Sequence, residues 1–221
     1  MEKLPFSVYD FFGNLSAGFL LMVAVVAAFL GEEALGDNPS AIVAILLVVL
    51  AYAIGQVIAN LSGFLFEATV LGRLLGRPTE HLFAGGRTRF ARLFPGYFRE
   101  LPTETQARVL GRARDAAGIA ETGQALFYHC HALVKKEEVT NERLNTFLNL
   151  YGFCRNCAMA LVVAVPLLAL GISLGSAETG LLAPGWWLLG GTLGAVGLFY
   201  RYLKFFRLYA VEVYVSYSEG S

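Results

Sequence analysis

Two short acidic stretches, Gly31–Ser40 and Ser176–Pro184, each lie between long apolar runs, and neither contains any of the chain's 17 lysine and arginine residues. A membrane-spanning helix needs roughly 20 apolar residues, and loops rich in Lys and Arg stay on the cytoplasmic side. The apolar runs of suitable length are Val8–Leu30, Ala41–Phe66, Leu148–Leu174 and Gly185–Leu203. The sequence therefore predicts an all-α integral membrane protein of the inner (plasma) membrane, with four transmembrane helices and both termini in the cytoplasm.

Composition supports a membrane protein, because 56% of the residues are hydrophobic and only 15% are charged. The first apolar run is too long for the core of a signal peptide, and a second run follows almost at once. The three cysteines, Cys130, Cys154 and Cys157, fall on the predicted cytoplasmic side. We therefore expect no structural disulfide.

The charge pattern predicts three regions along the chain. Residues 1–72 hold the first two membrane helices, residues 73–146 form an arginine-rich cytosolic helical domain, and residues 147–221 hold the last two membrane helices and a cytosolic C-terminal tail. Thr103 is the expected N-cap of a cytosolic helix, with Gln106 at its third position. The other expected boundaries are a stop at Pro78, helices over 103–117 and 121–136, and a long third-span helix starting at Thr140 or Asn141.

Two features favour a homo-oligomer, with a tetramer as the expected size. The cytosolic insert is short, so packing against symmetry-related copies would bury apolar surface that one copy leaves exposed. The fourth apolar run also has more glycines than one helix contact requires, and glycine lets helix backbones approach closely. These glycines are Gly185, Gly190, Gly191, Gly194 and Gly197.

Polar residues gather at the predicted inner ends of the membrane helices. At 1.5 Å per residue, Asp10, Asn60 and Arg155 lie about 30 Å from the outer end of their helices, and Asn14 and Gln56 lie about 6 Å deeper in the bilayer. Either these side chains line a water-filled vestibule of a pore, or they hydrogen bond between helices and lock the bundle. The candidate pore residues are Asp10, Asn14, Gln56, Asn60, Glu67, Arg155 and Asn156.

The region from Arg73 to Arg114 contains nine arginines, no lysine and three glutamates, a net charge of +6. Arginine presents a planar fork that suits phosphate, and the interleaved rings of Phe90, Phe94 and Tyr97 are typical of nucleotide-binding surfaces. Three interpretations remain open: a specific anionic ligand, attraction to membrane lipid, and internal ion pairing. The candidate ligand-binding residues are Arg87, Arg89, Arg92, Arg99, Arg108, Arg112 and Arg114.

Two motifs suggest metal or redox chemistry but have poor geometry for it. His129 and His131 flank Cys130, yet on a helix they point about 160° apart, and the Cys154–Cys157 pair lies among apolar neighbours. Small hydrophobic packing explains them better. No catalytic triad, paired catalytic carboxylates or metalloprotease motif is present, so we expect no enzyme activity, no metal and no cofactor.

Four spans, an arginine-rich cytosolic insert and a small size resemble the membrane channel effectors of prokaryotic anti-phage defence, in particular the Hailong-type oligonucleotide-controlled channel. The resemblance is architectural and covers the whole chain. It implies a tetramer-like assembly, a nucleotide or oligonucleotide partner made by a companion enzyme, and membrane depolarisation as the output. The alternative function is a non-channel membrane scaffold or carrier whose cytosolic arginines bind anionic lipid.

Overall fold

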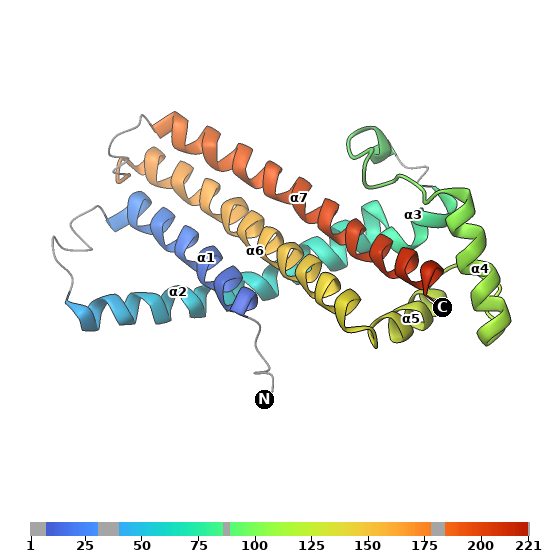
Figure 1. Ribbon diagram of the computed structural model, residues 1–221. Coiled ribbons are helices and arrows are strands. Elements are labelled where there is room, and N and C mark those ends of the chain that lie inside the picture. Colours follow the sequence, from blue (N-terminus) through green and yellow to red (C-terminus); the bar gives the residue numbers. More distant parts are fainter. Residues whose placement is uncertain (1–7, 31–39, 86–88, 178–183, 221) are drawn as a thin grey trace. The chain divides into compact units, whose positions relative to one another are not determined.

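The computed structural model describes residues 8–30, 40–85, 89–177 and 184–220, and within these ranges every regular element is helical (Figure 1). The acidic loops of the sequence analysis lie almost entirely outside the described residues. The elements are α1 (Val8–Val25), a π-helical turn η1 (Val26–Leu30), α2 (Ala41–Ser62), a π-helix η3 (Gly63–Leu75), α3 (Pro78–Ala84), a 3-10 turn η4 (Arg89–Arg92), α4 (Thr103–Ala117), α5 (Gln124–Val134), α6 (Glu138–Leu174) and α7 (Pro184–Glu219).

Three helical stretches of the described chain are long and apolar enough to cross a membrane: Phe11–Leu30, Ala41–Ala84 and Glu138–Leu174. The all-helical prediction is therefore confirmed together with three of the expected apolar helices. The fourth run, Gly185–Leu203, is helical as part of α7 but is less apolar, because glycines and the Trp186–Trp187 pair occupy many of its positions. A fourth span stays a prediction.

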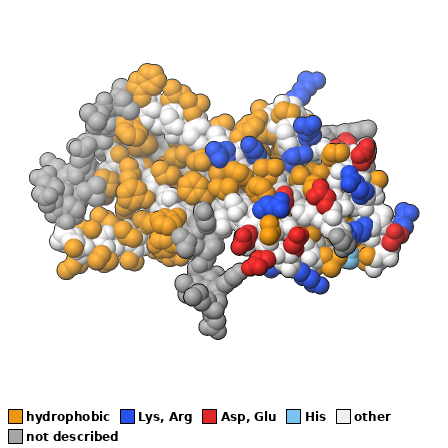
Figure 2. Space-filling view, in the orientation of Figure 1, with side chains coloured by type: hydrophobic (Ala, Val, Ile, Leu, Met, Phe, Trp, Pro, Cys, Tyr) orange, Lys and Arg blue, Asp and Glu red, His pale blue; other side chains and the backbone are white. Residues whose placement is uncertain are grey.

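The chain divides into two compact units. The first unit comprises residues 1–66 and 152–201, and the second comprises residues 67–151 and 202–221. On the face drawn in Figure 2, hydrophobic side chains cover most of the helices of the first unit, whereas charged side chains gather on the second unit. The apolar surface of the first unit is the kind of surface that a lipid bilayer covers.

Backbone-to-backbone contacts hold the helices of the first unit together. A Cβ atom on Gly18 of α1 would overlap the carbonyl oxygen of Ala51 on α2, and one on Gly55 of α2 would overlap the carbonyl oxygen of Asn14 on α1. Gly171 of α6 makes the equivalent approach to Ala28, in the π-helical turn after α1. Glycine is therefore required at the contact between α1 and α2 and at the contact between η1 and α6.

The second unit has its own hydrophobic core, to which α3, α4, α5, α6 and α7 all contribute. The core residues include Leu82, Leu101, Val109, Ala113, Leu126, Cys130, Val134, Leu144, Ala210, Val213, Tyr214 and Tyr217. Tyr214 and Val213 are fully buried. The segment expected as a tail is thus a helical part of this core.

Several helix boundaries differ from the sequence prediction: α5 spans Gln124–Val134 and not 121–136, and α6 begins at Glu138 and not at Thr140 or Asn141. The π-helix η3 ends before Gly76, whose φ of 76° lets the chain turn, and Pro78 begins α3 instead of ending the preceding helix. The turn is fixed by Tyr97, whose hydroxyl donates to the carbonyl of Gly76 (2.7 Å). The expected N-cap is also wrong: Pro102 occupies that position, and Gln106 Nε2 donates to the carbonyl of Leu101 (2.8 Å) instead of closing a capping box.

The backbone contact between α1 and α2 generates a stability prediction. Gly55→Ala should lower the free energy of unfolding of the detergent-purified protein on the order of 2 kcal/mol, because the new methyl group must displace the α1 backbone. Thermal unfolding followed by circular dichroism measures the change. Gly152→Ala in α6 is the control, since a Cβ there meets no atom within 4 Å. Equal melting temperatures for the two variants would contradict the contact.

Candidate functional site

A buried amide network joins three helices of the first unit. Asn156 of α6 donates through Nδ2 to Oδ1 of Asn14 on α1 (2.8 Å), and its Oδ1 accepts from the hydroxyl of Ser62 on α2 (2.9 Å). Arg155 adds a longer bond from Nε to the same oxygen (3.2 Å). Asn156 is only 5% exposed and Ser62 is fully buried. For Asn14 and Asn156 this geometry favours the interpretation in which polar side chains lock the bundle.

Gln56 and Asn60 lie on a different side of α2. The buried residues Ala51, Gly55, Ile58 and Ser62 form one stripe of this helix, at spacings of four, three and four. With 100° per residue, Asn60 lies opposite that stripe and Gln56 lies about 130° from its centre. Asn60 is exposed, Gln56 is half-buried, and neither side chain hydrogen bonds to a described residue. These two amides therefore face outward from the first unit.

The other expected pore residues do not join a common site. Glu67 belongs to the second unit, where the hydroxyl of Tyr151 donates to its Oε1. The side chain of Asp10 lies outside the described residues. Of the expected pore residues, the structure thus brings Asn14, Arg155 and Asn156 together and leaves Gln56 and Asn60 apart from them.

The expected ligand-binding arginines lie on several elements of the second unit. Arg89 and Arg92 are on η4, Arg99 lies between η4 and α4, and Arg108 and Arg114 are on α4. All five side chains are exposed, and none forms an ion pair with a residue that the structure describes. Internal ion pairing therefore does not account for them. Arg87 lies outside the described residues.

Arg112 has a structural role that the sequence analysis did not identify. Its Nη1 donates to the carbonyl of Tyr217 (2.8 Å) and to the carbonyl of Gly220, and its guanidinium carbon lies 4.9 Å from the centre of the Tyr217 ring. Arg112 thereby satisfies carbonyl groups at the end of α7 that have no partner within the helix. The contact spans more than a hundred residues, so helix spacing could not reveal it.

Most of the aromatic residues among the arginines pack into the core, whereas Phe90 of η4 is half-buried. Phe94, Tyr97 and Phe98 are at most 9% exposed, and the ring of His81 packs against both Tyr97 and Phe98. Phe83 packs edge-on against Tyr214 of α7. Phe94, Tyr97 and Phe98 are therefore not available to stack on nucleobases.

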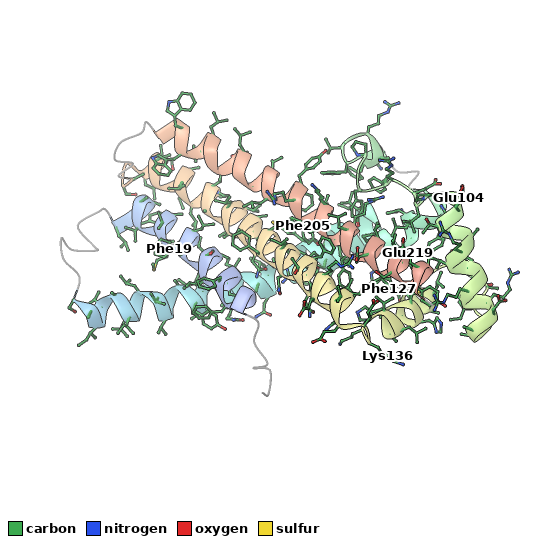
Figure 3. The ribbon with its side chains drawn as sticks, in the orientation of Figure 1. Phe19, Glu104, Phe127, Lys136, Phe205 and Glu219 are labelled. Carbon is green, nitrogen blue, oxygen red and sulfur yellow. The ribbon has the colours of Figure 1, made fainter. Side chains whose placement is uncertain are left out.

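The His129–Cys130–His131 motif attaches α5 to α7. The hydroxyl of Tyr209 forms a hydrogen bond with Nε2 of His131 (3.0 Å), and the hydroxyl of Tyr217 lies 3.3 Å from Nε2 of His129. Phe127, labelled in Figure 3, packs against Tyr209 from the same helix. Cys130 is fully buried between the two histidines, and burial raises the pKa of its thiol to about 12.

Within the described residues, no three His, Cys, Asp or Glu side chains are arranged to hold a metal ion. Cys154 and Cys157 are buried in α6 at 3% and 2% exposure. Cys157 packs as a small apolar side chain, whereas the thiol of Cys154 also contacts the side chain of Arg201.

Arg207 of α7 is a candidate site residue that the sequence analysis left out of the ligand set. Its Nε and Nη2 atoms donate to the backbone carbonyl of Arg99, at 3.3 and 2.9 Å. Burial and the neighbouring charge of Arg99 lower the pKa of Arg207. Two like charges from segments 108 residues apart thus lie together in the second unit.

The chain was compared with known proteins. No protein-family model, no curated protein and no solved structure is significantly similar to it.

The contact between His131 and Tyr209 generates a pH prediction. Burial, and to a lesser degree the charge of Lys135, lower the pKa of His131 from its ordinary value of 6.5. Between the lowered pKa and 6.5 the unfolded chain binds more protons than the folded one, so the stability that His131 contributes is present above pH 6.5 and is lost as the pH falls. His131→Gln keeps an acceptor for Tyr209 but does not titrate.

The stability difference between wild type and His131→Gln should therefore change in favour of the variant as the pH is lowered from about 7.5 to 5, through the histidine range. Thermal unfolding of both proteins in the same detergent at several pH values measures this. Melting curves that shift in parallel at every pH would contradict the role assigned to His131.

Proposed function

We propose that the chain is a homo-oligomeric membrane channel that an anionic ligand controls. In this proposal four helices cross the inner membrane, both termini and the second unit lie in the cytoplasm, and phosphate-bearing ligands bind the exposed arginines. The resemblance to anti-phage channel effectors adds a nucleotide or oligonucleotide as the ligand, a tetramer as the assembly and membrane depolarisation as the output.

The outward-facing amides of Gln56 and Asn60 carry the channel proposal. Lipid offers no hydrogen-bond partners, so polar side chains at membrane depth face another protein surface or water. No described side chain of the protomer supplies such a partner for either residue. A ring of protomers would place both amides along a shared aqueous path.

The glycines of α7 support the assembly. Gly191 and Gly194 are already in contact with Val165 and Leu161 of α6, where an added Cβ would lie 2.8 and 3.0 Å from a side-chain carbon. Gly190 and Gly197 have no described atom within 4 Å of an added Cβ. Seven residues apart, these two share one face of the helix, which leaves a close-packing seam for a second copy.

The exposed arginines support ligand control. Five cations without carboxylate partners create a positive field that attracts phosphate groups, and arginine binds them with two parallel hydrogen bonds. In the mechanism we propose, a bound anion favours one of two arrangements of the second unit. Because α6 runs without interruption from Glu138 to Leu174, that change reaches the membrane-spanning part through one helix.

The second candidate function is a non-channel scaffold or carrier whose arginines bind anionic lipid. The burial of Phe94, Tyr97 and Phe98 favours it, because these three rings cannot stack on bases and a lipid headgroup needs no stacking. Ion flux separates the two candidates, since only the channel conducts.

The channel predicts a specific effect of single substitutions on flux. Gln56→Leu and Asn60→Leu should each lower ion flux into liposomes about tenfold, because an apolar side chain dewets the path and removes about 1–2 kcal/mol of polar interaction. Melting temperatures should stay close to wild type, since neither amide hydrogen bonds to a described residue of the protomer.

Asn156→Leu is the matched control for that experiment. It removes an amide that bonds to Asn14 and Ser62, so it should lower the melting temperature. Absence of flux from wild-type protein in any anionic-ligand condition, or loss of folding in Gln56→Leu, would reject the channel in favour of the scaffold.

A further inference from the structure

We propose that Arg99 and Arg207 together form the binding site for a phosphate group. The inference rests on the proposed function, because it assigns the anion-binding role of the second unit to one pair of residues.

The position of Arg207 is fixed by the backbone. Its Nε and Nη2 atoms both donate to the carbonyl oxygen of Arg99. That carbonyl is itself held in place, since the amide of Leu101 donates to the carbonyl of Leu82 in α3 (2.9 Å) and Leu101 is buried. A guanidinium carries five N–H donors, so the Nη1 group of Arg207 remains for a ligand. The site is therefore preorganised on one side.

The side chain of Arg99 supplies a second charge to this site. It leaves the same residue whose carbonyl receives Arg207, and it is exposed. The two residues are neighbours, because Nη2 of Arg207 lies 2.9 Å from the carbonyl oxygen of Arg99. Two cations held together repel each other, and a dianion between them turns that repulsion into attraction.

No carboxylate in the described part of the chain neutralises the pair. Neither Arg99 nor Arg207 forms an ion pair with a described residue. Glu100 follows Arg99 directly, but its carboxylate lies against Gly85 at the end of α3. The positive charge is thus left for a ligand from outside the chain.

The ligand class follows from the donors. The oxygen atoms of a phosphate can bind two guanidinium groups at once. An isolated carboxylate occupies only one guanidinium group. The phosphate could belong to a soluble compound or to a lipid headgroup, because the chemistry of recognition is the same. An experiment distinguishes the two sources by supplying the phosphate either as a soluble compound or as a lipid.

The test uses the full chain with two probes. The first probe is inorganic pyrophosphate, titrated by calorimetry into protein in an uncharged detergent. The second is phosphatidylglycerol, compared with phosphatidylcholine in nanodiscs that contain the protein, with the melting temperature as readout. The variants are Arg99→Gln, which keeps the backbone carbonyl that anchors Arg207, and Lys136→Gln. Lys136 is a matched control because it is an exposed cation of the second unit outside the ligand set, and it forms no ion pair with a described residue.

We expect Arg99→Gln to weaken binding of the active probe about tenfold, which is what loss of one charge-assisted contact gives, while Lys136→Gln leaves it within about twofold of wild type. Arg207→Lys keeps the charge but loses the fork, and should weaken binding similarly. A response to pyrophosphate assigns a soluble ligand, and a response to phosphatidylglycerol alone assigns a lipid.

Three results would overturn the site: no binding of either probe, equal weakening in Arg99→Gln and Lys136→Gln, or unchanged affinity in Arg99→Gln. Ion flux measured both with and without the probes tests the channel separately. Arg99→Gln protein that conducts but has lost phosphate binding would leave the channel intact, and protein that binds phosphate but never conducts would leave only the site.

Discussion

The arrangement of the first unit depends on the direct backbone contact between α1 and α2 at Gly18 and Gly55. This approach brings the Asn14 side chain of α1 within hydrogen-bonding reach of Asn156 on α6, which in turn accepts from Ser62 of α2. In a helix bundle surrounded by lipid, close packing and interhelical hydrogen bonds replace the hydrophobic effect as the source of association. The two glycines allow the close approach of the helices, and the amide network forms because of it, so both hold the same helices together.

The second unit is organised around the last turns of α7. Tyr214 is buried in its core, Tyr209 and Tyr217 contact the histidines of α5, and Arg112 of α4 binds the carbonyl groups at the helix end. Consequently α4 and α5 are both attached to one helix. Under the proposed function, an anion bound at Arg207 acts on this same helix.

The sequence predicts helices well where length and composition suffice. The apolar runs correspond to α1, α2 and α6 because spanning a bilayer requires little beyond about 20 apolar residues. Local signals were less reliable: glycine at position 76 and not Pro78 made the turn, because glycine adopts positive φ without strain. Partners distant in the sequence were not predictable, and the roles of Arg112 and Arg207 both depend on such partners.

The central claim is that several copies of the chain enclose a path lined by side chains that one copy leaves without partners. Native mass spectrometry of the detergent-purified protein tests it most directly, because it reports the number of subunits and any bound anion together. The account predicts a closed assembly of four or more subunits that carries a phosphate-containing ligand. A monomer that carries only lipid would contradict it, since no path between subunits would then exist for Gln56 and Asn60 to line.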